Sequence, residues 1–564
     1  MVEESGHMME IKNNYFVKLL TIARVFFIFF VVQTLSLTGH EASANNLTIS
    51  KFNTTAMDTA SKTITFSCDV TWDNSWRSTI NYDAIWVFVK YSTDAGITWS
   101  HASMSSSGKN PPGFKAPNSF EILVPQDIKG FFLQRTDLSS GSVTAQDVRF
   151  VWNYGQDGLS DQVATAANTI NKVFGIEMVY IPQGSFFAGD GNSSSDYRFK
   201  QGSADNDPWY IQGETAITTA SVANDGFYYQ GAGSPGENNS GDNFIIPTSF
   251  PKGYQAAYQM KYELTEGQWV SFFNTLPIVA KPNRDITAAT VGGKNTDDAV
   301  NRNTISWDAS NPLSKATTLR PYRPVSFISW PDLLAYADWA ALRPMTELEF
   351  EKSARGSDIN PIADEFAWGK TSYNQAEVSE IFPDTDEDGA EQIFDGSANL
   401  NRNNLGWTSG DGRSGGTAQA QSGPLRVGIF AEGSSNRESS GAGYYGTMEL
   451  SGNLSEMIVT VGKSSGRQFL GSHGDGRLST LGGYEGNATN IDWPGIDVTD
   501  SARGVRMTSG SGYRGGDFNS SNIRNFQIST RSLAAKDPDS NGYYQRYDQN
   551  FGVFQGGRLV RTAP

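Results

Sequence analysis

Residues 323–356, RPVSFISWPDLLAYADWAALRPMTELEFEKSARG, predict a strand, a helix, a turn and a second helix. Pro331 suits the first turn of a helix, where its missing N–H would be unpaired anyway. The apolar residues of the first helix then recur on one face, at Leu333, Tyr336, Ala337 and Ala340. After the Arg-Pro break, Thr346 and Glu349 have the spacing of a capping box, in which each side chain satisfies the other's backbone donor. Physical chemistry alone therefore predicts a packed helical pair beside a strand.

The composition describes a large, acidic and loop-rich protein. The chain has 564 residues, of which 38% are hydrophobic and 12% aromatic, enough for a sizeable core and more than one domain. The 58 glycines and 22 prolines indicate many loops. A net charge of -16 and a pI near 4.8 argue against binding to nucleic acid or anionic lipid, because both would be repelled. We attribute the acidity to solubility and scattered cation sites.

The N-terminus has the pattern of a secretory signal peptide. Basic residues precede an apolar run at residues 25–32, and the small-residue site Ala42-Ser43-Ala44 follows. We expect residues 1–44 to be removed and the mature chain to be secreted or displayed at the cell surface. An uncleaved anchor is less favoured, because Arg24 and Gln33 leave a run shorter than the roughly 20 residues of a spanning helix. No later run is longer, so the mature chain is expected to have no transmembrane segment.

The chain contains one cysteine, Cys68, in an alternating, strand-like run. A single cysteine excludes an internal disulfide, so the fold depends on its core and on any bound metal. An intermolecular bridge is one interpretation of Cys68, but a buried small hydrophobic residue is the favoured one.

Residues 45–165 predict an all-β sandwich of immunoglobulin-like size, because short alternating runs are separated by turn clusters. Its tryptophans either form a sugar-binding platform or, as favoured here, belong to the core; they are Trp72, Trp76, Trp86 and Trp99. Residues 166–176 are expected to be a connector, and residues 177–564 a second domain.

A series of motifs in the second domain carries a family resemblance. The segments in chain order are MVYIPQGSFFAGDG at 178–191, YELTEGQWVSFFNTL at 262–276, the stretch at 323–356, AWGK at 367–370, YYGTMELSGNLSEM at 444–457, YRGGDF at 513–518, ISTRS at 528–532 and NFGVFQGGRLVR at 550–561. Together they resemble the formylglycine-generating-enzyme, or sulfatase-modifying-factor, family. The resemblance spans about residues 177–561 and implies an α+β domain of C-type-lectin-like topology, placed after the all-β sandwich.

The resemblance also implies which chemistry is missing. Family members that oxidise a sulfatase cysteine use two cysteines near the C-terminus, which hold copper and exchange with the substrate thiol. Ile523 and Ile528 occupy those positions here, and the second domain contains no cysteine. A related branch, the sulfoxide synthases, uses iron held by three histidines, whereas the mature chain has only His101 and His473. No catalytic residue is therefore assigned, and the chain is predicted to be non-catalytic.

Calcium is the predicted cofactor, in a structural role. The loop DTDEDG, with a later aspartate at position 12, resembles a calcium loop whose ligands would be Asp384, Asp386, Asp388 and Asp395; a solvated acidic loop is the alternative. The family resemblance implies a second site at Glu449, Gly452, Leu454 and Glu456. It implies a third at Asn399, Leu400 and Asp411.

The C-terminal strands and loops are expected to form a recognition surface. Asparagine, tyrosine and arginine combine hydrogen bonding with flat aromatic area. The residues predicted to bind the ligand are Arg514, Asn519, Asn522, Arg524, Tyr543, Tyr544 and Arg546. An ordinary polar loop is the alternative interpretation.

These observations favour an exported, non-catalytic binding or structural protein whose partner is an extracellular ligand, either a protein or a glycan. One alternative is a metal-dependent oxidoreductase of the same superfamily with an unrecognised site. Another is a component of a cell-surface or motility assembly, in which the chain would self-assemble.

Overall fold

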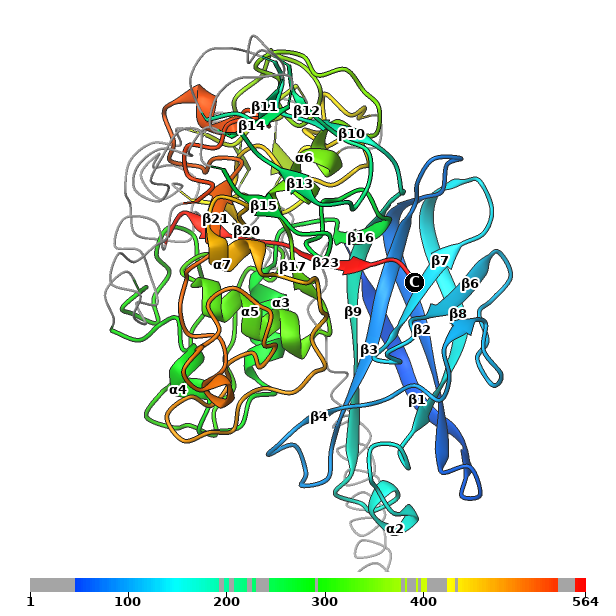
Figure 1. Cartoon of the computed structure of the whole chain (residues 1–564). Coiled ribbons are helices and arrows are strands. Elements are labelled where there is room, and N and C mark those ends of the chain that lie inside the picture. The colour runs from blue at the N-terminus through cyan, green and yellow to red at the C-terminus, as the bar shows by residue number, and fades with distance from the viewer. Residues whose placement is uncertain are drawn as a thin grey trace, which may run out of the picture. The chain divides into compact units, whose positions relative to one another are not determined.

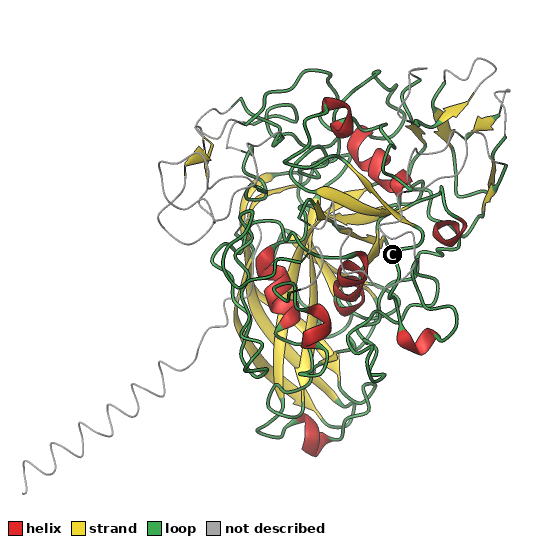
Figure 2. Ribbon diagram, turned by 90° about the vertical axis from the view of Figure 1, so that its left-hand side faces the viewer, coloured by secondary structure: helices red, strands yellow, loops and turns green. Residues whose placement is uncertain are grey.

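The structure is a computed structural model of the chain, and Figures 1 and 2 show its β-rich α+β architecture. It describes residues 46–191, 197–201, 207–220, 226–229, 243–289, 293–376, 381–382, 392–393, 397–402, 423–431, 435–535 and 553–564. The expected signal peptide lies outside the described residues.

The first sheet has three antiparallel strands in the order β1-β2-β8, which are β1 (Thr48–Asp58), β2 (Thr63–Trp76) and β8 (Ser140–Asn153). Every second residue of β2 is buried from Ile64 to Trp72, as its alternating sequence predicts. Cys68 is one of them, with 1% of its surface exposed, which confirms the prediction of a buried small residue.

A second sheet of nine strands joins residues from both ends of the chain. Its order is β17-β23-β16-β9-β3-β7-β6-β5, and β4 pairs with β3. The strands are β3 (Asp83–Ser92), β4 (Ser100–His101), β5 (Gly108–Lys109), β6 (Phe120–Val124), β7 (Phe131–Arg135), β9 (Ile170–Ile181), β16 (Ala257–Met260), β17 (Arg343–Pro344) and β23 (Leu559–Thr562).

Residues 166–176, expected to be a connector, include the first half of β9. Ten residue pairs join β9 to β3, from Asp83–Val179 to Ser92–Ile170. The backbone donors of this segment are therefore used in a sheet rather than left in a linker. The chain passes from the N-terminal strands to the following region within one strand.

Strand β3 is buried on both faces, because each face has its own core. Ile85, Val87 and Val89 pack with the three-stranded sheet to form a sandwich core. Trp86 and Phe88, on the opposite face, pack into the larger core that includes the helices. This burial explains why β3 reads as a nearly continuous apolar run.

The core contains two of the four N-terminal tryptophans. Trp72 and Trp86 are buried, as the core interpretation predicts, whereas Trp76 and Trp99 are half-buried. The indole N–H of Trp86 donates to the carbonyl of Ala340 at 2.9 Å. The guanidinium of Arg561 lies 4.3 Å from the Trp86 ring and pairs with Asp127, in the loop between β6 and β7. The C-terminal strand therefore contacts the N-terminal strands directly.

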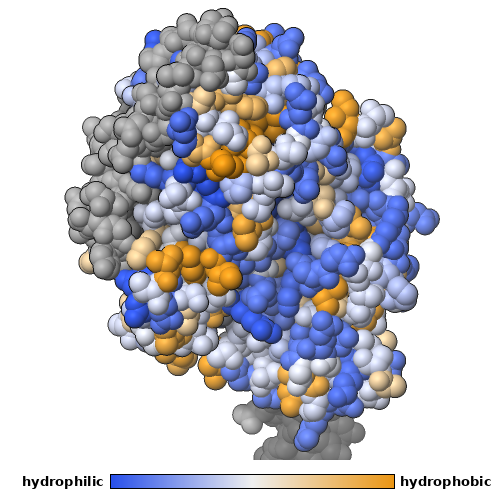
Figure 3. Space-filling model, viewed as in Figure 1, coloured by the Kyte–Doolittle hydropathy of each residue, from blue (hydrophilic) through white to orange (hydrophobic). Residues whose placement is uncertain are grey.

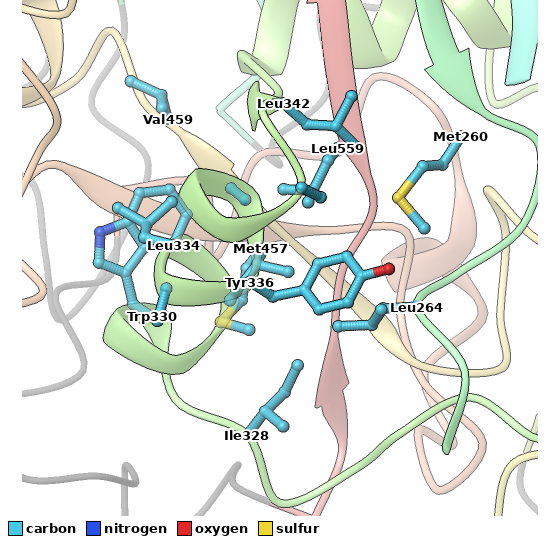
Figure 4. Close-up of a cluster of buried hydrophobic side chains, with 14 of the residues drawn as sticks. Met260, Leu264, Ile328, Trp330, Leu334, Tyr336, Leu342, Met457, Val459 and Leu559 are labelled. Atoms are coloured by element: carbon cyan, nitrogen blue, oxygen red, sulfur yellow. The ribbon is translucent and has the colours of Figure 1, made fainter. Parts of the chain in front are cut away.

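Two helices, α3 (Glu266–Phe273) and α5 (Trp330–Trp339), pack over the face of the large sheet that carries Trp86 and Phe88. Helix α6 (Glu347–Arg355) packs against Ala257 and Val560, on the other face. The predicted capping boxes of α3 and α6 are confirmed, and Ser329 with Asp332 adds another at α5. All ten residues of α5 are buried. Figure 4 shows why: Trp330, Leu334 and Tyr336 project among side chains from several other segments.

The strand predicted before α5 does not form. Residues 323–329 contribute one isolated bridge, between Pro324 and Thr265. Phe327 has a φ of +63°, a left-handed conformation that interrupts an extended ladder. The chain there is an extended loop that leads into the capping box of α5.

The other elements are short. The two-stranded antiparallel sheets are β10 (Phe186–Ala188) with β12 (Trp209–Ile211), β11 (Lys200–Gln201) with β14 (Phe227–Tyr228), β13 (Ile217–Thr218) with β15 (Ile245–Ile246), and β18 (Ile381–Phe382) with β19 (Gln392–Ile393). A last sheet joins β20 (Ser455–Val459), β21 (Ser511–Arg514) and β22 (Gln555–Gly556). The short helices are α2 (Asp161–Ala164), α4 (Lys281–Arg284), α7 (Ser464–Arg467), η3 (Ser501–Arg503) and η4 (Ile523–Phe526).

Among the described residues, no helix has the length and apolar character needed to cross a membrane. On the face drawn in Figure 3, hydrophobic residues form separate patches rather than one continuous band.

The Trp86 contact predicts that the N-terminal strands and the helical region unfold together. Trp86→Phe removes the indole N–H and leaves the buried Ala340 carbonyl without that donor, which we expect to lower the free energy of unfolding by about 1–3 kcal/mol. Urea unfolding followed by circular dichroism measures this. Trp99→Phe is the matched control, because the Trp99 indole bonds only locally, to Gly96. Separate unfolding transitions for the two regions would contradict the prediction.

Candidate functional site

Helix α6 organises the region that contains the predicted site residues. Glu347 accepts hydrogen bonds from the Val461 amide at 2.8 Å and from Arg531 Nε at 2.8 Å. Glu351 accepts from Arg514 Nη2 at 2.6 Å and from Arg355 at 3.0 Å. These side chains are fully buried. Helix α6 therefore holds three parts of the chain in place: β21 through Arg514, the residues just after β20 through Val461, and the segment after β21 through Arg531.

Arg514 needs a correction, because it was expected to lie on an exposed recognition surface. Its side chain has no exposed area and is paired with Glu347 and Glu351. Although burial alone would raise the pKa of Glu351, Arg514 and Arg355 hold that pKa below its usual value. The charge of Arg514 is therefore neutralised by two buried carboxylates and is not exposed to a ligand.

The other predicted ligand-binding residues divide into two groups. Asn519 is half-buried, and Asn522 and Arg524 are exposed on the segment that contains η4. Beside them lies a cavity of about 20 Å³, lined in part by Asp517 and Thr530. Burial raises the pKa of Asp517. The remaining predicted residues lie outside the described part of the chain; they are Tyr543, Tyr544 and Arg546.

The two positions that the family resemblance assigns to cysteines hold isoleucines in a well-packed segment. Ile523 begins η4 and is half-buried. Ile528 is 1% exposed, and its amide donates to the Glu365 carbonyl at 3.0 Å. Their side chains are part of, or packed against, a small apolar core with Phe350 and Phe526. Neither position offers a thiol or another metal-binding atom.

A buried carboxylate centre lies at the segment 449–456, where the sequence predicts calcium. Glu449 and Glu456 are 5% and 0% exposed. Glu449 Oε1 accepts from the Gly428 amide at 2.7 Å, and Glu456 Oε1 accepts from Arg558. The second oxygen of each carboxylate is buried without a hydrogen-bond partner. Unpaired buried carboxylate oxygens are costly, so these two atoms mark the centre as a candidate ligand site.

Glu263 is a third member of this centre, and the sequence analysis missed it. It is fully buried and accepts from the Leu454 amide at 2.9 Å and from Asn453 Nδ2 at 2.8 Å. The signal for it was present, since Glu263 is the charged residue of the YELT motif just before α3. Sequence alone did not show that this motif packs against the segment 449–456.

Burial and mutual repulsion disfavour the ionised forms of these carboxylates. Burial raises the pKa of Glu449 to about 7. The pKa of Glu263 is raised well above its usual range, first by burial and then by the negative charge of Glu456. Arg558 opposes these shifts, and Arg426 also lowers the pKa of Glu449. A bound divalent cation would favour the ionised form of these carboxylates.

The backbone of this segment is held in conformations that L-residues seldom adopt. Glu449 and Asn453 have φ values of +53° and +66°. Gly452, with φ of +98°, approaches so closely that a Cβ would lie 2.8 Å from the Asn401 carbonyl oxygen. Asn453 holds the turn, donating to Glu263 and accepting from the Leu425 amide at 2.8 Å. Strain of this kind persists where the surroundings impose it, as at ligand sites.

These residues fit calcium by the nature of their donors. Glu449 and Glu456 would supply carboxylate oxygens, and Gly452 and Leu454 backbone carbonyls, which is the hard oxygen set that Ca²⁺ prefers. Among the described residues, no three acidic, histidine or cysteine side chains are placed to hold a metal by themselves. The fit therefore depends on the carbonyl groups as well as the carboxylates.

The other predicted calcium ligands are only partly placed. Asn399 is buried, its Oδ1 accepts from the Asn374 amide at 2.9 Å, and its Nδ2 donates to the Glu438 carbonyl at 2.9 Å. Leu400 is fully buried beside it. The remaining predicted ligands lie outside the described residues; they are Asp384, Asp386, Asp388, Asp395 and Asp411.

Comparison with known proteins shows the family of the chain. The family described as sulfatase-modifying factor enzyme 1-like domain matches residues 167–539. The chain belongs to this family. Formylglycine-generating enzymes are among its relatives: that of Thermomonospora curvata is 46% identical over 50 residues, which cover 9% of this chain and 16% of the enzyme. That of Streptomyces coelicolor is 34% identical over 92 residues, which cover 16% of this chain and 27% of the enzyme. Each similarity therefore spans less than a third of the relative.

The carboxylate centre predicts a pH-dependent response to calcium. The pKa of Glu449 is raised from 4.5 to about 7 on folding, so the stability it contributes is full below about pH 4.5 and is lost as the pH rises through about 7. Calcium requires the ionised carboxylate and would act most strongly above that window. We expect the melting temperature to rise more on calcium addition at about pH 8 than at about pH 5.5, measured by differential scanning fluorimetry against EDTA.

Glu449→Gln separates calcium binding from folding. The amide oxygen still accepts from Gly428, so we expect stability in EDTA to be kept, while the calcium response falls to less than about a tenth. The exposed substitution Asp298→Asn is the matched control and should leave the response unchanged. An undiminished response in Glu449→Gln would contradict the assignment.

Proposed function

We propose that this family member is an exported binding protein, stabilised by calcium, that does not generate formylglycine. The observation that carries the proposal is the pair of isoleucines, Ile523 and Ile528, at the positions of the family's copper-binding cysteines. Thiolates are required because a soft sulfur ligand must both bind Cu(I) and exchange with the substrate thiol. The chain's single cysteine, Cys68, is buried in β2 within the sandwich core.

Calcium is proposed as a structural cofactor at the carboxylate centre. It would bind Glu449, Glu456 and neighbouring carbonyls and would tie the segment 449–456 to α3 through Glu263 and to β23 through the Arg558 that precedes it. A chain of this length without disulfides gains stability from such a link. The role fits a scaffold rather than a catalytic metal, because Glu449 and Glu456 are almost fully buried.

The proposed recognition surface is the C-terminal face. Asn522 and Arg524 are exposed there. With Arg514 withdrawn into the α6 ion pairs, recognition is assigned to these residues, to Asn519, and to Tyr543, Tyr544 and Arg546. The proposed partner is an extracellular protein or glycan.

The direct test is a search for formylglycine formation. The purified chain, supplied with Cu(I), oxygen and a thiol reductant, is incubated with a peptide that carries a sulfatase cysteine, and the product is examined by mass spectrometry. We expect no conversion, because no thiolate pair is present. The Streptomyces coelicolor enzyme under the same conditions is the positive control. Conversion by this chain would refute the proposal and would favour the alternative of a metal-dependent oxidoreductase.

A further inference from the structure

A polar pocket on another part of the domain is not explained by the calcium centre or by the C-terminal face. Its volume is about 240 Å³, and it opens between the loop 247–257, β17 and the C-terminal end of β23. Thr248 and Ser249 are exposed at its rim. Leu470, which is 57% exposed, forms another part of the rim.

The charged groups of the pocket are already paired, so it is not built to capture an anion. Arg343 donates to both oxygens of Glu349, at 2.9 Å and 2.6 Å, and to Thr562 Oγ1 at 3.2 Å. This two-pronged pair neutralises the guanidinium within the wall. A phosphate or carboxylate ligand would have to displace Glu349, which also caps α6.

Hydrogen-bond acceptors remain at the pocket surface. Glu214 accepts from the amides of Lys252 at 2.7 Å and Gln255 at 3.0 Å, which holds the loop 247–257 in place. Each carboxylate oxygen has more than one lone pair and retains capacity for a ligand hydroxyl. The exposed hydroxyls of Thr248 and Ser249 donate or accept as needed.

A buried amide beneath the pocket lacks partners. Gln259, on β16, is fully buried, and neither its oxygen nor its nitrogen has a hydrogen-bond partner. It lines an inner cavity of about 10 Å³ that shares Gly253, Gln255, Ala257 and Glu349 with the larger pocket. The inner cavity has room for about one water molecule. Buried amides are rarely left unsatisfied, so one water molecule in this inner cavity is the expected partner of Gln259.

The size and chemistry of the pocket indicate the class of ligand. A volume of 240 Å³ is below the range of about 300–1,000 Å³ for drug-sized ligands, so one small ring fits. Donors and acceptors lie beside apolar surface from Pro251 and Leu470. We infer that this pocket binds a neutral, hydroxyl-rich ligand, a single monosaccharide unit.

The site is independent of the proposed function. None of its lining residues belongs to the carboxylate centre or the C-terminal face. Formylglycine formation and sugar binding are measured separately, so failure of one proposal leaves the other standing.

The experiment uses the full chain and a panel of neutral sugars, namely D-glucose, D-galactose, D-mannose and N-acetyl-D-glucosamine, in saturation-transfer NMR and calorimetry. Leu470→Trp and Ser249→Trp fill the rim from two sides without removing a buried contact. We expect at least one sugar to bind saturably and each rim variant to weaken that binding by about tenfold or more. Inorganic phosphate, acetate and glycine are the charged comparison probes and should not bind.

One matched variant completes the design. Val498→Trp adds the same side chain at an exposed position outside the pocket. It should bind the sugar within about twofold of the unmodified chain. No binding by any sugar, binding that both rim variants leave unchanged, or binding of the charged probes alone would overturn the inference. Circular dichroism confirms that each variant is folded.

Discussion

The buried carboxylates of α6 are the constraint on which the helical region depends. Glu347, Glu349 and Glu351 alternate along one helix, and each meets an arginine from a different part of the chain. Breaking one such buried pair leaves an uncompensated charge and costs about 3–5 kcal/mol, whereas the intact pairs add little net stability over apolar packing. Their contribution is therefore to specify position. They hold β17, β21 and the segment after β21 around one helix, in a region where much of the chain has no regular secondary structure.

The large sheet connects the helical region to the N-terminal strands. Because β9 pairs with β3 on one side and β16 on the other, the N-terminal sandwich and the family domain share a sheet. The carboxylate centre lies where Glu263, just before α3, meets the segment 449–456 and Arg558, which precedes β23. The centre therefore joins segments that are far apart in sequence, and a calcium ion there would tie them together without any disulfide.

Much of this organisation follows from the sequence, and the exceptions have physical causes. The alternation of β2, the caps of α3 and α6 and the family landmarks are local patterns, and they were predicted. The prediction of a strand before α5 was wrong, because nothing in the sequence indicates that Phe327 adopts a left-handed conformation. The withdrawal of Arg514 into the α6 pairs depends on long-range packing, which one sequence does not encode locally. Glu449 and Glu456 were found because both lie within one sequence motif. Glu263 was missed because its contacts with that motif are long-range.

The most direct test of the proposal that the chain is calcium-stabilised and non-catalytic is its metal content, measured by elemental mass spectrometry after gel filtration without chelator. The account predicts bound calcium without stoichiometric copper or iron. It also predicts one calcium fewer per chain in Glu449→Gln, because that carboxylate has a buried, unpaired oxygen. Stoichiometric copper or iron, or the same calcium content in both proteins, would contradict it.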